Sequence, residues 1–252
     1  MTQALSPAAR LTEATECGVV ELRQYTLHPG QRATLLELFE RELVETQEVL
    51  GMRVLGQFRD LDDADRFVWL RGFADMAARR RGLAAFYGGP VWAAHRDAAN
   101  ATMIDSDNVL LLRPAWPGAT AAIEAGKQGD AGAAHGATGL VDVTVFPLRE
   151  PAGAELLAWC GDRMVATLAE AGAIRLGWYV TEASANDFPR LPVREGEHVL
   201  VGVAVFASGA AFERFRDGGA WARDVASGLA KWLAAPAQSL RLLPTARSAL
   251  RA

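Results

Sequence analysis

Hydrophobic and polar residues alternate over Val19–Leu27, which is the pattern of a β-strand with two unlike faces. One face carries Val20, Leu22, Gln24 and Thr26, and the other carries Glu21, Arg23 and Tyr25. Positions 31–50 then place apolar residues three, four or seven apart, as in an amphipathic helix, and Gly51 follows where a helix-ending glycine is expected. The two patterns predict a strand that leads through a turn at 28–30 into a helix.

The pattern continues with two further strands, two helices and a fourth strand. We predict strands at 53–59 and 66–73, joined by a polar turn at 60–63. Asp75 is placed to cap a helix that reaches position 87, and Pro90 to begin one that reaches 101. A last strand is expected at 108–113. The resulting order, β-α-β-β-α-β, is that of a ferredoxin-like unit.

The second half of the chain repeats this pattern at a fixed spacing. Asp142, Gly172 and Gly177 repeat Glu21, Gly51 and Gly56, since 142 − 21, 172 − 51 and 177 − 56 all equal 121. A longer connection at 182–197 raises the spacing to 133 for the match of 201–206 with 68–73. Strands are expected at 140–148, 174–181, 198–206 and 240–243, and helices at 152–171, 210–216 and 221–234. We therefore predict an α+β fold of two tandem ferredoxin-like units that pack sheet to sheet.

The first unit resembles the NIPSNAP family. The resemblance rests on the strand and turn E-L-R-x-Y-T-L-x-P-G at 21–30, on the aromatic strand at 68–73, and on Trp92 with its helix. It is weaker in the second unit, where Thr144, Phe146 and Glu150 replace the arginine, the tyrosine and the proline. The resemblance implies a dimeric α/β-barrel fold, here as a pseudo-dimer within one chain. Relatives in that superfamily include cofactor-independent oxygenases, lactone isomerases and haem enzymes, so it does not fix an activity.

Composition divides the chain into five parts. We expect a disordered arm at 1–18, the first unit at 19–114, an Ala- and Gly-rich linker at 115–139, the second unit at 140–244 and a tail at 245–252. The linker is expected to be partly mobile and the internal segment that proteases cut first. The 182–197 connection should lie over or beside the mouth of the barrel, because it joins two barrel strands.

The alternating faces suggest where a ligand would bind. We expect the apolar strand faces to pack on the helices and the mixed faces to point into the barrel. The candidate catalytic residues are then Glu21 as a base, Arg23 and Tyr25. Arg23 or Arg71 would hold an anionic or enolate oxygen, and Tyr25 would donate a hydrogen bond. Candidate ligand-binding residues are Trp69, Arg71, Phe73, Asp142 and Thr144. Gly202 and Ala204, which match Trp69 and Arg71, would leave a cavity open on one side.

Two interpretations of these residues stay open. Glu21, Arg23 and Arg71 could pair with one another as a structural network, because buried charges need partners. The chain would then be a non-catalytic binding or assembly module. Otherwise it binds a small organic molecule in the barrel interior and acts as a cofactor-independent enzyme, similar to an oxygenase or an isomerase.

Charge and composition narrow the classes of partner. A net charge of −4 and a pI near 5.6 argue against nucleic acid or an anionic membrane. No apolar run is long enough to span a membrane, and no signal peptide is apparent, so a cytoplasmic protein is expected. The expected partners are a small-molecule ligand and, as an open alternative, further copies of the chain.

The residues that bind metals and cofactors are sparse. The four histidines, His28, His95, His135 and His198, have no metal-ligand spacing. A haem would need a proximal histidine in the second unit, where the only one, His198, begins a strand, so we expect no haem and no other cofactor. Of the two cysteines, Cys17 is expected in the disordered arm and Cys160 in the core. The run Arg79-Arg80-Arg81 is expected to form a solvated helix face.

Overall fold

The strands form one closed barrel in the computed structural model, which describes residues 16–124, 126–129 and 139–252. The order around the barrel is β1-β3-β2-β8-β5-β7-β6-β4, and β4 pairs with β1 to close it. All eight pairings are antiparallel. The strands are β1 (Val19–Leu27), β2 (Arg53–Asp60), β3 (Arg66–Phe73), β4 (Met103–Pro114), β5 (Leu140–Pro147), β6 (Ala173–Thr181), β7 (Val199–Phe206) and β8 (Gln238–Pro244).

Each half of the barrel is one ferredoxin-like unit. The order β4-β1-β3-β2 in the first unit matches β8-β5-β7-β6 in the second. The units meet where β2 pairs with β8, as at Arg59 and Leu243, and where β4 pairs with β6, as at Arg113 and Val180. Two units of one topology that pack sheet to sheet are therefore confirmed.

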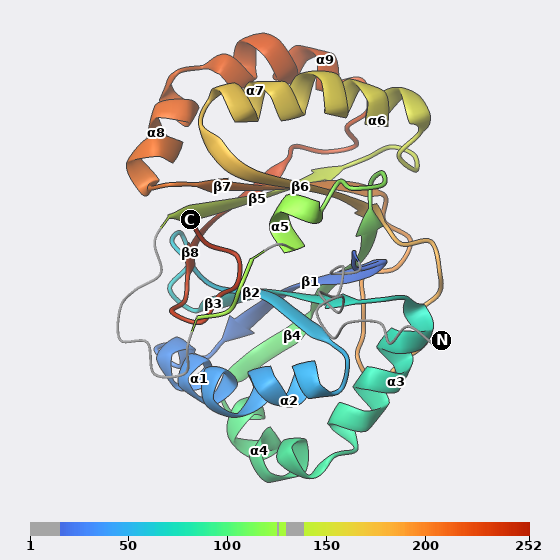
Figure 1. The fold of residues 1–252 in the computed structure, drawn as a ribbon, viewed down its shortest axis with the longest axis vertical. Helices are drawn as coiled ribbons and strands as arrows, with labels where there is room; N and C mark the ends of the chain where they lie inside the picture. Colours follow the sequence, from blue (N-terminus) through green and yellow to red (C-terminus); the bar gives the residue numbers. More distant parts are fainter. Residues whose placement is uncertain (1–15, 125, 130–138) are drawn as a thin grey trace, which may run out of the picture.

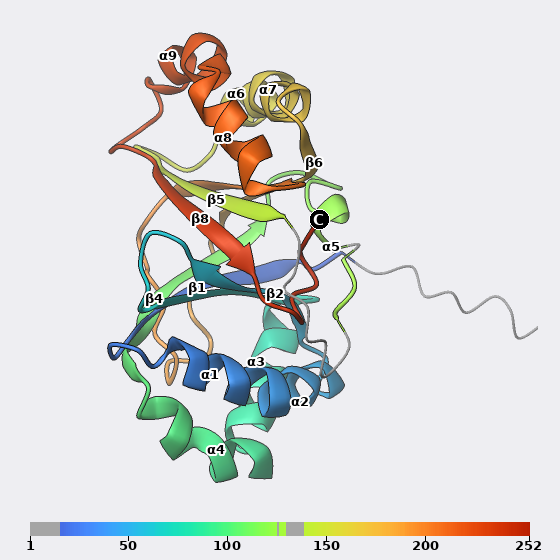
Figure 2. The ribbon, with the colours of Figure 1, turned by 90° about the vertical axis from the view of Figure 1, so that its left-hand side faces the viewer.

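The helices cover the outer faces of the two sheets, so the barrel lies between two helical layers (Figures 1 and 2). The first unit has α1 (Arg32–Leu38), η2 (Phe39–Leu43), α2 (Val44–Val49), α3 (Met76–Tyr87) and α4 (Pro90–Asn100). The second has α6 (Ala154–Trp159), η3 (Cys160–Met164), α7 (Val165–Glu170), α8 (Gly209–Asp217), η4 (Ala222–Ala226) and α9 (Ser227–Leu229). The π-helical turns η2 and η3 both lie within the first helix of their unit, 121 positions apart (160 − 39), so the repeat extends to an irregularity of the backbone.

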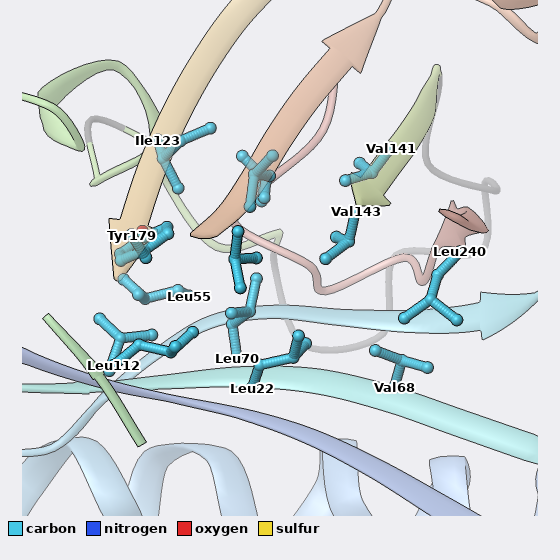
Figure 3. Packing of buried hydrophobic residues seen from close by; sticks show 14 of the residues in the cluster. Leu22, Leu55, Val68, Leu70, Leu112, Ile123, Val141, Val143, Tyr179 and Leu240 are labelled. Carbon is cyan, nitrogen blue, oxygen red and sulfur yellow. The ribbon is translucent and has the colours of Figure 1, made fainter. Parts of the chain in front are cut away.

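Aliphatic side chains fill the barrel (Figure 3). Leu22, Val68 and Leu70 of the first sheet lie opposite Val141 and Val143 of the second, and none is exposed. The expected orientation of the strand faces is therefore wrong: the apolar faces point inward and the mixed faces point to the helices. The physical reason is the width of the barrel, because the interior of an eight-stranded barrel is only wide enough to be filled by its own side chains. Bulky charged and aromatic residues fit better between a sheet and its helices.

Two segments expected to lie outside the two units pack against the barrel. In the expected linker, α5 (Ala121–Glu124) brings Ile123, 1% exposed, into the barrel core. In the expected tail, Leu250 is 0% exposed in the same core, and Ser248 donates to its carbonyl oxygen. Cys17 belongs to that core too, although it was expected in the arm. Residues 1–15, 125 and 130–138 lie outside the described part, so the expectations for them stay untested.

The 182–197 connection reaches from the second unit to the first. Its backbone bonds to β4, since the amides of Glu182 and Arg194 donate to the carbonyl oxygens of Leu111 and Val109. Phe188 stacks on Tyr87 of α3, with ring centroids 6.0 Å apart. The connection thus lies along the helix side of the first unit, which agrees only in part with a place beside the barrel mouth.

Candidate functional site

A closed cluster of charged side chains lies between the first sheet and its helices. Three arginines donate to Glu21 on β1. Arg71 donates to Oε2 through Nη2 at 2.6 Å and Nε at 3.1 Å, Arg23 donates to Oε2 through Nη1 at 2.9 Å, and Arg79 donates to Oε1 through Nε at 2.8 Å. None of the four side chains is more than 1% exposed. Both carboxylate oxygens are therefore occupied by the protein itself.

Aromatic rings line the same cluster. The Arg71 guanidinium carbon lies 4.9 Å from the ring centroid of Trp69 and 5.5 Å from that of Phe73. The Arg23 guanidinium lies 5.3 Å from the Tyr25 ring, and its Nε donates to the Tyr25 hydroxyl at 2.9 Å. The structure thus brings together six of the expected site residues, although outside the barrel and packed on one another.

Arg79 is the member of this cluster that sequence analysis missed. It was expected on a solvated face, but it is 0% exposed, and its Nη1 donates to Asp187 at 2.7 Å in the 182–197 connection. The missed signal was helical spacing: Arg79, Gly82, Leu83 and Phe86 recur at the intervals of one buried helix face. Arg80 and Arg81 are exposed, as expected.

The electrostatics of this cluster oppose a role for Glu21 as a base. Burial opposes ionisation of Glu21, but the guanidiniums of Arg71, Arg23 and Arg79 outweigh it and hold its pKa well below the usual range. A carboxylate fixed in this way is a poor base. Burial raises the pKa of the Tyr25 hydroxyl, which accepts a hydrogen bond from Arg23.

A cavity of about 630 Å³ lies at the corresponding place in the second unit. Its walls are mostly aromatic and aliphatic: Phe146, Leu168, Trp178, Phe212, Phe215 and Trp221. Phe146 and Trp221 stack with ring centroids 5.9 Å apart, and Trp221 meets Phe215 edge to face at 6.4 Å. The size and the apolar walls are typical of a site for a small organic molecule.

The cavity exists because small residues replace large ones. Gly202 on β7 stands where the first unit has Trp69, and Ala204 where it has Arg71, and both line the cavity. A Cβ on Gly202 would lie 2.7 Å from Cζ3 of Trp178, so only glycine lets that indole lie on the strand. Trp178 is 2% exposed, and no acceptor for its Nε1 occurs in the described part of the chain.

Asp142 is the polar centre of the cavity. The Ser239 hydroxyl donates to its Oδ1 at 2.5 Å and the Thr144 hydroxyl to its Oδ2 at 2.8 Å. Asp142 is 8% exposed, and no cation among the described residues forms an ion pair with it. Burial raises its pKa above the ordinary value, although the two hydroxyls act in the opposite direction. A carboxyl group with a raised pKa in an apolar cavity is a good candidate for proton transfer.

Both units contribute to the rim of the cavity. Asp62, from the turn after β2, accepts from Nε of Arg241 on β8 at 2.9 Å. Nη1 of Arg241 donates to Glu213 at 3.3 Å, and Glu213 also pairs with Arg216 of α8. Both rim arginines are therefore neutralised by acids.

The remaining candidates do not form a site. His95 lies 3.6 Å from Glu42 on the surface of the first unit, and His135 lies outside the described part. In the ranges that the structure describes, no three histidine, cysteine, aspartate or glutamate side chains are grouped as metal ligands, and no helix could cross a membrane. Cys160 is buried in the core as expected.

Comparisons with solved structures define the class of fold. A "putative monooxygenase" from Lactobacillus acidophilus NCFM matches with a TM-score of 0.58 at 10% identity, over 92% of this chain and 97% of that one. A second protein with that description, from Fusobacterium nucleatum, matches with a TM-score of 0.57 at 8% identity, over 90% of this chain and 92% of that one. An anthrone oxidase-like protein matches with a TM-score of 0.51 at 14% identity, over 95% of this chain and 98% of that one. At such identities the matches show the fold alone, which is that of the dimeric α/β barrels.

The sequence comparison adds a family match for the first unit. Residues 20–116 match the NIPSNAP family model. The resemblance that the strand-and-turn signature indicated is therefore confirmed for the first unit. A comparison with curated proteins finds no match.

Proposed function

We propose that the cavity of the second unit binds a small aromatic molecule and that Asp142 accepts a proton from it in an oxygenase reaction. The observation that carries the proposal is a carboxyl group with a raised pKa, set among aromatic walls and without a cation partner among the described residues. The descriptions of the similar folds, two as monooxygenases and one as anthrone oxidase-like, suggest the reaction class.

For an anthrone, the proposed chemistry is balanced by dioxygen alone. Asp142 takes one proton from the ring methylene, which leaves a carbanion conjugated with the ring carbonyl. The carbanion reduces dioxygen and bonds to one of its oxygen atoms, which becomes the new carbonyl oxygen. The second methylene proton leaves with the other oxygen atom, and the proton on Asp142 completes a molecule of water. We propose that no bound cofactor takes part.

The reaction needs the protein for two purposes. The aromatic walls exclude water from the carbanion, and Asp142 removes the proton at a fixed place.

Dioxygen uptake with anthrone as the probe tests the proposal. The wild-type protein should consume dioxygen with anthrone and form anthraquinone. Asp142→Asn, which keeps the shape of the side chain but removes the carboxylate that acts as the base, should lower kcat about 100-fold or more. Asp162→Asn, an exposed aspartate on the same unit, is the matched control and should leave the rate unchanged. Equal rates for wild type and Asp142→Asn would contradict the role of Asp142.

A non-catalytic module is the second candidate. The fully paired Glu21 cluster supports a structural role for the charges of the first unit. In that case aromatic probes would bind in the cavity without uptake of dioxygen.

A further inference from the structure

The second unit keeps the acid and the aromatic walls of the first but none of its cations. Asp142 stands at the position of Glu21, and Phe146 at the position of Tyr25. The indole comes from the neighbouring strand in the second unit. In the first unit Trp69 pairs with Gln57, and in the second the equivalent pair is Gly202 with Trp178. The carboxylate and its aromatic surroundings are thus present in both units.

The three guanidiniums that hold Glu21 all have uncharged counterparts. Thr144 replaces Arg23 and Ala204 replaces Arg71, at the spacings of 121 and 133. Phe212 replaces Arg79, since each lies four positions after the residue that caps its helix, Ser208 for α8 and Asp75 for α3.

Vacant space remains where two of these cations would lie. Thr144 and Ala204 both line the cavity, as does Asp142. In the first unit the equivalent volume holds a guanidinium that stacks on the Trp69 ring at 4.9 Å while it pairs with Glu21. The first unit therefore shows what this combination of acid and aromatic ring accommodates, which is an organic cation.

The charges around the cavity agree with this. Arg241 is paired with Asp62 and Glu213, and Arg216 with Glu213 and Asp217. The ionisable residues that line the cavity are Asp62, Asp142, Arg216 and Arg241, and both arginines pair with acids. An anionic ligand would face the Asp142 carboxylate with no unpaired arginine among the described lining residues to hold it, whereas a cation gains an ion pair and ring contacts.

We propose that the ligand of this cavity carries a cationic nitrogen, a protonated amine joined to a flat aromatic ring, with the nitrogen at Asp142 and the ring against Trp178. The proposal rests on the cavity being the ligand site, as proposed above, and not on the oxygenase reaction. Anthrone is a probe of the reaction, and amines are probes of recognition.

Calorimetric titration with three indoles of different charge tests the proposal. Tryptamine is a cation at pH 7, tryptophol is neutral and indole-3-acetate is an anion. The wild-type protein should bind tryptamine at least 10-fold more tightly than tryptophol and indole-3-acetate least. Asp142→Asn should abolish the preference for tryptamine, and Asp162→Asn should preserve it. Ala204→Arg, which restores the guanidinium of the first unit, should block tryptamine.

The outcomes separate this proposal from the proposed reaction. Equal binding of tryptamine and tryptophol, tightest binding of indole-3-acetate, binding of none of the three, or a preference that survives in Asp142→Asn would each overturn it. Dioxygen uptake that depends on Asp142 would still support the reaction in those cases. Conversely, a cation preference that depends on Asp142 supports this proposal even if anthrone is never oxidised.

Discussion

Glu21 and Asp142 occupy the same strand position in the two units, but Glu21 accepts hydrogen bonds from three arginines and Asp142 accepts them from two hydroxyl groups. The same backbone thus holds one acid whose pKa is lowered and one whose pKa is raised. We therefore propose opposite roles for the two acids: Glu21 stabilises the fold, and Asp142 is available to a ligand.

Asp142→Asn should stabilise the protein at neutral pH. The folded state raises the pKa of Asp142, so it binds the proton more tightly than the unfolded chain does. The stability that comes from this proton is fully present at a pH below the ordinary pKa, and it is lost as the pH rises through the raised pKa of the folded state. The asparagine variant has no such loss, and each kcal/mol gained would raise Tm by about 2–4 °C. A variant less stable than wild type at pH 7 would contradict the interpretation.

Proton acceptance by Asp142 also predicts the pH dependence of the reaction. The carboxylate is the active form, so kcat with anthrone should rise with pH and level off above the raised pKa. A pH–rate profile between pH 4 and 9 measures this. A rate that falls over that range would show that the protonated acid is the active form.

Removal of the acid from the first cluster should destabilise the fold strongly. Glu21→Gln leaves three buried guanidiniums without their shared carboxylate, and the loss of a buried partner costs about 3–5 kcal/mol. Arg23→Met should cost less, because Glu21 keeps Arg71 and Arg79. Glu155→Gln, whose ion pair with Lys231 is exposed, should cost less than about 1 kcal/mol. A larger loss of unfolding free energy for Arg23→Met than for Glu21→Gln, measured by denaturant unfolding, would contradict this network.

Two glycine substitutions test the packing of α5 on the second unit. A Cβ on Gly177 would lie 2.4 Å from Cγ1 of Ile123, so Gly177→Ala should cost about 1–3 kcal/mol through overpacking. Gly161 in η3 has no atom within 4 Å of such a Cβ, and alanine there should stabilise the helix by up to about 1 kcal/mol. If thermal unfolding shows equal effects, α5 does not pack as the structure describes.

Both thiols should be inert in the folded protein. Burial raises the pKa of Cys17 to about 12, and burial also raises that of Cys160. Since the thiolate is the reactive form, an aromatic disulfide reagent should modify neither thiol until the chain unfolds, and then both. Rapid reaction of the native protein would show that Cys17 is not held in the barrel core.

Much of the fold followed from the sequence, whereas the direction of each strand face did not. Alternation groups Val20 with Leu22 and Glu21 with Arg23, but the side on which the helices lie is a tertiary property. Asp142 and Thr144 were expected ligand residues, and both line the cavity. The walls from α8 and the turn after it were missed because their position depends on helix packing.

The most direct test of the account is a crystal structure of the protein with tryptamine. We predict electron density for the indole ring in the cavity of the second unit, against Trp178, with the nitrogen about 3 Å from a carboxylate oxygen of Asp142. Density beside Glu21 or within the barrel, with the cavity of the second unit empty, would contradict the account.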